Sequence, residues 1–223
     1  MRALLLPIKD LSKAKQRLAE VLASEERFAL AQAMLEDTAR AVAGLGGAAK
    51  VFVVTMYEPA MDLAARNGWE VLREEQQISE SASVDFASRV CEERGVSGLL
   101  RLPCDLPLIQ PEDIEDLLAA ACHAPGMVVV PSRDGSGTNA ILRTPPTLFR
   151  SHFGKNSLAK HLREAEQAGA QIILQRNARV ELDVDDEGDL RALLEEDLRG
   201  TATGEWLERS GVAARVRGRA AAG

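Results

Sequence analysis

A chain of 223 residues, 46% of them hydrophobic, is long enough to bury a large core and favours one α/β domain. Its formal net charge of -7 and its aromatic content of 4% argue against a nucleic-acid-binding surface, because phosphate backbones would be repelled and few side chains could stack on bases. Three cysteines without CxxC spacing indicate neither a disulfide framework nor a zinc site. The sequence also lacks an apolar run of the roughly 20 residues that span a bilayer, so a cytoplasmic protein is predicted.

Hydrophobic runs and helical periodicity alternate along the chain, which predicts strands that alternate with helices. Strands are predicted at residues 3–8, 51–55, 69–72, 98–102, 127–131, 139–143, 171–174 and 180–184. Helices are predicted at residues 24–42, 58–67, 79–94, 112–121, 156–167 and 186–196. This order favours a single three-layer α/β domain with a mostly parallel sheet over residues 1–210. Residues 211–223, rich in Arg, Ala and Gly and without periodicity, are predicted to form a disordered tail.

A lysine-rich loop follows the first predicted strand. The segment KDLSKAKQRL places Lys9, Lys13, Lys15 and Arg17 within nine residues, directly after that strand. Backbone amides and cations in such a loop could hold a triphosphate and neutralise the charge that develops on a leaving pyrophosphate. The GxxxxGK[ST] pattern of a P-loop is absent, and an ordinary solvated basic loop is the competing interpretation.

Two acidic segments end predicted strands. Asp105 lies in the proline-flanked, apolar stretch LPCDLP, where a carboxylate is costly unless it is paired or binds a cation. Asp183 and Asp185 lie at the end of the strand predicted over residues 180–184, and alternation along a strand points them to the same side. Because Mg²⁺ needs few carboxylates beside phosphate oxygens and water, these three residues predict a magnesium site. The alternative for Asp105 is a helix cap or a salt-bridged acid.

The acidic run at residues 183–189 has two further interpretations. An EF-hand frame that begins at Asp183 has Leu194 where position twelve requires a bidentate glutamate, so a calcium loop is not favoured. Asp186 is expected to cap the helix predicted over residues 186–196. That role for Asp186 still leaves Asp183 and the carboxylate two residues later free to bind a metal.

Two segments rich in small residues offer hydrogen-bond donors. In SRDGSGTN the glycines let the backbone approach a ligand, and Thr138 and Asn139 can bond an anion or a sugar. An ordinary turn explains this segment equally well. In FGKNSLAKH a helix begins, and Gly154 and Ser157 would gather donors around a phosphate or carboxylate. His161 is interpreted as a surface or packed histidine.

Five segments occur in an order that resembles the CofC/FbiD-type guanylyltransferases of coenzyme F-420 biosynthesis. They are PIKDLSKAKQRL, LPCDLPL, GSGTNA, FGKNSLAKH and ELDVDDEGDL, and the likeness extends over about residues 2–194. The resemblance implies a nucleotide-diphospho-sugar transferase-like fold, similar to the molybdenum-cofactor nucleotidyltransferases. It also implies Mg²⁺-dependent joining of GMP from GTP to 2-phospholactate, phosphoenolpyruvate or 3-phosphoglycerate, with release of pyrophosphate.

The same resemblance implies roles for single residues. Asp105, Asp183 and Asp185 would hold Mg²⁺, with Asp105 and Lys15 as catalytic residues. The nucleotide would be bound by Pro7, Lys9, Lys15, Arg17, Ser83, Asp85 and Pro103. The acid substrate would be bound by Thr138, Asn139, Gly154 and Ser157.

One stretch departs from the family pattern. Residues 81–87, SASVDFA, stand where many relatives carry a Gly-Leu-Asn-Ala segment, with Asp85 in place of the usual asparagine, which leaves the base preference open. Two alternative functions remain: a nucleotidyltransferase of the molybdenum-cofactor type, and a regulatory domain that binds a nucleotide or metal without turnover. No nucleic-acid or membrane partner is expected, and a homodimer stays compatible with the sequence.

Overall fold

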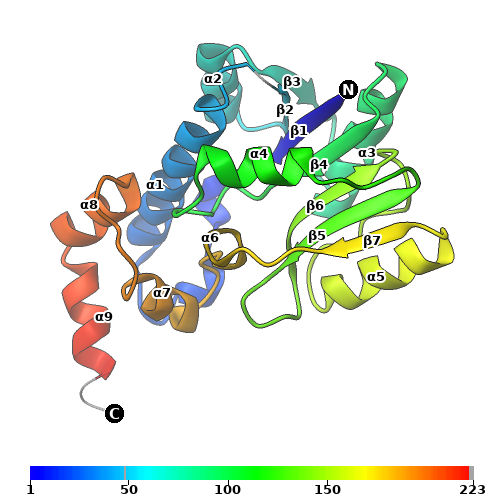
Figure 1. Cartoon of the computed structure of the whole chain (residues 1–223). Coiled ribbons are helices and arrows are strands. Elements are labelled where there is room, and N and C mark those ends of the chain that lie inside the picture. Colours follow the sequence, from blue (N-terminus) through cyan, green and yellow to red (C-terminus); the bar gives the residue numbers. More distant parts are fainter. Residues whose placement is uncertain (48, 221–223) are drawn as a thin grey trace.

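The computed structural model describes residues 1–47 and 49–220 and has a central sheet between layers of helices (Figure 1). In these residues seven strands form the sheet: β1 (Arg2–Pro7), β2 (Lys50–Thr55), β3 (Glu70–Arg73), β4 (Gly98–Arg101), β5 (Gly126–Pro131), β6 (Thr138–Thr144) and β7 (Gln171–Leu174). Their spatial order is β3-β2-β1-β4-β6-β5-β7. β6 is antiparallel to its neighbours β4 and β5, and the other pairs are parallel. The predicted mostly parallel α/β sheet is confirmed.

Helices pack on both faces of the sheet. On one face lie α1 (Ser24–Ala43), α2 (Glu58–Asn67), α4 (Pro111–Ala119) and α6 (Ala178–Glu181), and on the other lie α3 (Glu80–Glu93) and α5 (Ser157–Gln167). Successive strand residues point to opposite faces, so in β1 Leu4 and Leu6 contact the first layer while Ala3 and Leu5 contact the second. This burial on both faces explains the continuous apolar runs of the central strands. No helix in the described residues is long and apolar enough to cross a bilayer.

The C-terminal part of the described chain is helical, which corrects the predicted disordered tail for residues 212–220. α7 (Glu187–Leu193) is followed by α8 (Ala202–Arg209), which lies beside α1, and by α9 (Val212–Ala220), which continues from α8 toward the C-terminus (Figure 1). Val212 and Val216 of α9 are buried in an apolar cluster with α1, α7 and α8. Two valines four residues apart bury one helix face, a signal too weak to recognise among arginines and alanines. Residues 221–223 of the predicted tail lie outside the described residues.

The strand predicted over residues 180–184 is also absent from the described structure. The side chain of Asn177 accepts hydrogen bonds from the N–H groups of Arg179 and Val180, and this cap starts the single turn of α6. The chain that follows alternates buried and half-buried residues from Leu182 to Asp185 but pairs with no strand of the described sheet. Apolar alternation therefore predicted its buried side, but not its place in the fold.

The polar loops lie at one edge of the sheet, where the parallel strands have their carboxyl-terminal ends. β1, β4 and β5 run in the same direction, so the segments that follow them leave the sheet at this edge. Because β6 runs in the opposite direction, its first residues, Thr138 and Asn139, begin at the same edge. Sequence segments more than 100 residues apart thus meet around one opening.

Candidate active site

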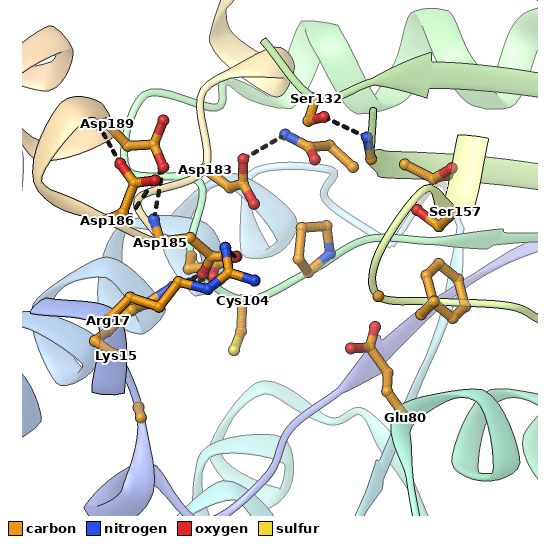
Figure 2. Close-up of a pocket in the computed structure, with 18 of the residues that line it drawn as sticks. Lys15, Arg17, Glu80, Cys104, Ser132, Ser157, Asp183, Asp185, Asp186 and Asp189 are labelled. Carbon is orange, nitrogen blue, oxygen red and sulfur yellow. Dashed lines mark hydrogen bonds and ion pairs between the residues drawn. The ribbon is translucent and has the colours of Figure 1, made fainter. Parts of the chain in front are cut away.

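A cavity of about 1250 Å³ opens at this edge of the sheet, and most of the predicted site residues line it. The predicted residues in its wall are Pro7, Lys9, Lys15, Arg17, Pro103, Asp105, Thr138, Asn139, Gly154, Ser157, Asp183 and Asp185. Figure 2 shows the cationic residues Lys15 and Arg17 beside Asp185, with Ser157 across the cavity from them. The cavity therefore has an acidic wall next to a basic loop, and a wall of small polar residues opposite.

Three carboxylates converge on one point of the cavity. One oxygen from each of Asp105, Asp183 and Asp185 lies within 4.8 Å of the others. Asp105 belongs to the loop after β4, and the other two belong to the segment between α6 and α7. Leu182 and Val184 are buried in the C-terminal apolar cluster, so the alternating aspartates turn to the opposite side, toward the cavity. The predicted metal-binding trio is brought together.

Lys15 places a buried cation among these carboxylates. Its backbone is left-handed, with φ of 54°, and its ammonium group contacts Asp105 and lies 3.0 Å from Asp185 Oδ1. Burial alone would lower the pKa of Lys15, but the charges of Asp105 and Asp185 outweigh it and raise that pKa. Likewise burial would raise the pKa of Asp185, but the Lys15 ammonium holds it below its usual value. Lys15 is therefore charged and fixed inside the acidic cluster.

The cluster still carries more negative than positive charge. Burial and the neighbouring charges of Asp105 and Asp185 raise the pKa of Asp183 to about 7. Asp105 Oδ1 is buried and has no hydrogen-bond partner in the described residues. A carboxylate oxygen without a partner and a carboxyl group that resists ionisation both call for an additional cation. Because the donors are hard oxygens, the trio fits Mg²⁺.

The neighbouring acidic residues Asp186 and Asp189 cap the following helix and lie outside the trio. The Asp186 side chain accepts a hydrogen bond from the Asp189 N–H at 3.1 Å, which caps α7 as expected. Asp189 in turn accepts from the N–H groups of Asp185 and Asp186 and pairs with Arg133. This local network fixes the backbone at Asp185, and so sets where its carboxylate points.

The polar wall opposite is formed where β6 and α5 begin. The Asn139 amide donates to the carbonyls of Val180 and Glu181 at 2.9 Å and to Asp183 Oδ1 at 3.0 Å. Its two amide hydrogens are therefore shared among these three acceptors, and the predicted contact of Asn139 with the acid stays a prediction. Thr138 and Ser157 are buried, with exposed fractions of 7% and 2%, and both line the cavity.

Sequence reasoning missed an ion pair in the cavity wall. Arg101, the last residue of β4, is 6% exposed, donates to the Asn139 carbonyl at 2.9 Å and pairs with Glu80. Its guanidinium lies 4.3 Å from the centroid of the Phe153 ring. Cys104 also lines the cavity, and burial raises the pKa of its thiol to about 12, which disfavours the thiolate form. A charged residue that ends the apolar strand GLLR is the signal that would have revealed Arg101.

Residues 1–221 match the protein family described as guanylyl transferase CofC like. The chain belongs to this family. It is 35% identical to the phosphoenolpyruvate guanylyltransferase of Rubrobacter xylanophilus over 187 residues, which cover 84% of this chain and 90% of that protein. It is 34% identical to the 3-phospho-D-glycerate guanylyltransferase of Phenylobacterium zucineum over 175 residues, which cover 77% of this chain and 80% of that protein. The CofC-like chain is therefore a guanylyltransferase.

Solved structures agree on the fold. A nucleotide-diphospho-sugar transferase from Desulfovibrio desulfuricans superposes with a TM-score of 0.77 at 16% identity, covering 97% of this chain and 96% of that one. The 4-diphosphocytidyl-2C-methyl-D-erythritol synthase of Anaerococcus prevotii gives a TM-score of 0.58 at 8% identity, covering 88% and 99%. At these identities the likeness concerns the fold alone. The guanylyltransferase has the predicted nucleotide-diphospho-sugar transferase-like fold.

The structure of the CofC-like chain does not bring two predicted nucleotide-binding residues to the site. Ser83 donates to Glu74 at 2.9 Å, and Asp85 accepts from the Ser151 N–H at 2.9 Å and lies 3.8 Å from Arg143. Neither Ser83 nor Asp85 is among the described residues that line the cavity. Asp85 instead ties α3 to the loop after β6. Asp85 thus has structural partners in this chain.

Proposed function

We propose that this guanylyltransferase transfers GMP from GTP to phosphoenolpyruvate or 3-phosphoglycerate and releases pyrophosphate, in the biosynthesis of coenzyme F-420. The names of the relatives supply the two acids. The observation that carries the proposal is the meeting of Asp105, Asp183 and Asp185 in a cavity that a basic loop also lines. Carboxylates beside cations suit a metal-bound triphosphate.

The acidic trio would hold Mg²⁺, which would supply positive charge to the triphosphate oxygens around the α-phosphorus. Lys15 keeps Asp105 and Asp185 in place from within the cluster. Asn139 orients Asp183 by its 3.0 Å hydrogen bond. These contacts preorganise the carboxylates, so little rearrangement is needed when the nucleotide binds.

The basic loop is proposed to bind the triphosphate. Lys9, Lys13 and Arg17 are exposed and line the cavity beside the carboxylates. Arg17 lies 3.9 Å from Asp185 Oδ2, a weak contact that leaves its guanidinium able to reach a phosphate. The charge that develops on the departing pyrophosphate would be neutralised by these side chains.

The transfer needs no covalent enzyme intermediate. An oxygen of the acid's phosphate forms a bond to the α-phosphorus while the bond from that phosphorus to the bridging oxygen of the β-phosphate breaks, and pyrophosphate leaves. Thr138, Gly154 and Ser157 are proposed to bind the acid, since they lie in the wall opposite the basic loop. Their part would be to align the attacking oxygen with the α-phosphorus.

The cytoplasm is the proposed site of the reaction, because GTP is available there. Contacts with the base are not assigned to Ser83 or Asp85, whose side chains are engaged away from the cavity.

The test is pyrophosphate release from GTP and Mg²⁺ with phosphoenolpyruvate, 3-phosphoglycerate and 2-phospholactate offered separately. Release that depends on phosphoenolpyruvate or 3-phosphoglycerate is expected, and ATP or CTP in place of GTP should support little. Asp105→Asn and Asp183→Asn should lower turnover by at least about 10²-fold while the far-UV circular dichroism stays that of the wild type.

Other results would redirect the assignment. Wild-type-like turnover in either variant would contradict the metal site. GTP binding without release would favour the non-catalytic domain. Release only with a molybdopterin acceptor would favour the molybdenum-cofactor type of enzyme.

A further inference from the structure

His161 lies directly behind Thr138 in the wall of the cavity. It belongs to α5 and is 0% exposed, and its ring packs against Phe149 and Phe153 with centroid distances of 5.9 and 5.1 Å. Its Nε2 accepts a hydrogen bond from the backbone N–H of His152 at 2.9 Å. Its Nδ1 lies 3.0 Å from Thr138 Oγ1. Both ring nitrogens therefore have one polar partner each.

These contacts determine which nitrogen of His161 carries the hydrogen. A nitrogen that accepts from a backbone N–H must present its lone pair, so Nε2 is unprotonated. Burial, and then the positive charge of Arg143 and the neighbouring His152, lower the pKa of His161 to about 3, with smaller effects from the other cations nearby. A neutral imidazole has one N–H group, and here it is on Nδ1. His161 is therefore a donor to Thr138.

This donation constrains the hydroxyl group of Thr138. Since Oγ1 accepts from His161, the hydroxyl hydrogen cannot point back at the ring and has to find an acceptor elsewhere. Thr138 lines the cavity, as do Gly154 and Ser157. We propose that His161 is a positioning residue that holds the Thr138 hydroxyl as a hydrogen-bond donor toward an anionic oxygen of the acid substrate. This inference rests on the proposed function, which places the acid in this part of the cavity.

A hydroxyl held in this way favours an anion over a neutral group. An unconstrained threonine hydroxyl can point its hydrogen in any staggered direction, whereas the His161 N–H occupies one lone pair of Thr138 Oγ1 and turns the hydroxyl hydrogen away from the ring, which favours donation toward the cavity. A donor to a carboxylate or phosphate oxygen makes a stronger hydrogen bond than one between neutral groups. His161 thus contributes to the affinity for the acid without contact with it.

Two substitutions separate the two nitrogens of the ring. His161→Gln keeps an acceptor for the His152 N–H, near the place of Nε2, but has no donor at the place of Nδ1. His161→Asn keeps an amide donor near Nδ1 and loses the acceptor. We expect the KM for the acid to rise about tenfold in His161→Gln and to recover largely in His161→Asn, with the KM for GTP unchanged in both. His123→Gln, at an exposed histidine outside the cavity, is the control.

A double-mutant cycle tests whether the effect passes through Thr138. In a Thr138→Val background, which lacks the hydroxyl, His161→Gln should raise the KM for the acid no further. If His161 had only a structural role, His161→Gln would raise the KM for the acid by the same factor in both backgrounds and would change the KM for GTP as well. Thermal unfolding of each variant excludes loss of folded protein, and equal effects in both backgrounds would overturn the inference.

The tautomer can be read without any activity. Nitrogen-15 NMR of the imidazole rings should show His161 protonated at Nδ1 and not at Nε2 at pH 7. An Nε2–H tautomer or an imidazolium at pH 7 would overturn the inference whatever the substrate. If the wild type released no pyrophosphate with any acid, the proposed function and the acid's part in the inference would fail together, while the spectrum would still decide the donor role of His161.

Discussion

Asp183 is the residue whose charge the acidic cluster supports least. Lys15 contacts Asp105 and Asp185 but not Asp183, whose oxygen accepts only from the neutral amide of Asn139 among the hydrogen bonds described. Burial and the two neighbouring carboxylates therefore raise its pKa to about 7. A metal ion bound by the trio would compete with this proton.

We predict that Mg²⁺ binds about tenfold more weakly at pH 6 than at pH 8. One unit below the pKa of Asp183, about ten of eleven molecules carry the proton that the metal must displace, whereas one unit above it about one of eleven does. Calorimetric titration of the metal-free protein with Mg²⁺ at both pH values measures the ratio. Equal affinities would contradict the raised pKa.

The same carboxyl group affects stability in the metal-free protein. Its folded pKa lies above its unfolded value, so the folded state keeps a proton that the unfolded state releases. Stability should therefore fall as the pH rises from about 4 to 7, by at most about 1.4 kcal/mol per pH unit. Asp183→Asn removes the titrating group and is the control, since its unfolding free energy should lack this slope.

At the scale of residues, the side chains suited to a metal site were easier to predict than the partners that single side chains contact. The metal trio could be found because a carboxylate in an apolar segment is costly without a cation, and the structure brings Asp105, Asp183 and Asp185 together. Asp85 could not be placed, because its partners Ser151 and Arg143 come from distant segments. The contact of Asn139 with the substrate stays a prediction, whereas the hydrogen bond from its amide to Asp183 was not predicted.

At the scale of elements, α9 shows how little sequence signal a docked helix can carry. Val216 is 1% exposed and packs into the apolar cluster shared with α7 and α8. Arg215 pairs with Glu26 of α1, and Arg217 donates to the Leu194 carbonyl at 2.8 Å. The first contact ties the helix to a residue 189 positions earlier in the chain, and the second ties it to one 23 positions earlier.

We predict that Val216→Ala lowers the free energy of unfolding by about 2 kcal/mol, through lost burial and the cavity left behind. Urea denaturation measures the change. Ile78→Ala is the control, because Ile78 is 79% exposed and its truncation should change stability by less than about 0.5 kcal/mol. An equally small effect at Val216 would mean that α9 contributes little to the fold.

The strands of the sheet and most helices that cover it were predictable, because their hydrophobic patterns are strong and depend on residues close together in the sequence. β1 and β2 are buried on both faces and therefore read as continuous apolar runs. α2 ends at Gly68, whose left-handed φ of 68° is the helix stop that glycine predicts. α6 was not predictable, since one cap by Asn177 decides between a turn of helix and the extended alternation around Val180.

At the scale of the whole molecule, a group of exposed cations lies beside the cavity of a protein whose net charge is negative. The net charge is -7, yet Lys9, Lys13, Arg17 and Lys155 are exposed around the cavity. The cavity wall holds charges of both signs, and the exposed cations of the basic loop attract an anion over a short range, even on a molecule that repels it at long range. The proposed triphosphate would be drawn to this basic loop.

We predict that Lys9→Gln combined with Lys13→Gln raises the KM for GTP about tenfold and weakens its dependence on salt, because fewer cations attract the triphosphate. Steady-state kinetics at KCl concentrations between about 50 and about 300 mM measure this dependence, because salt in this range increasingly screens exposed charges. Lys50→Gln is the matched control, since Lys50 begins β2 at the opposite edge of the sheet and pairs with Glu70. A similar rise in the KM for GTP in Lys50→Gln would indicate that the overall charge of the protein, and not the basic loop, attracts the triphosphate.

The antiparallel strand β6 divides the site into two parts that depend on different strand pairs. The basic loop and Asp105 follow β1 and β4, whereas Thr138 is carried by the hairpin of β5 and β6. A change in the hairpin loop that keeps Asn139 and Arg133 can therefore reshape the proposed acid-binding wall without moving the basic loop or Asp105. Such a division allows a lineage to exchange one acceptor for another and retain its nucleotide, as relatives named for two different acids would require.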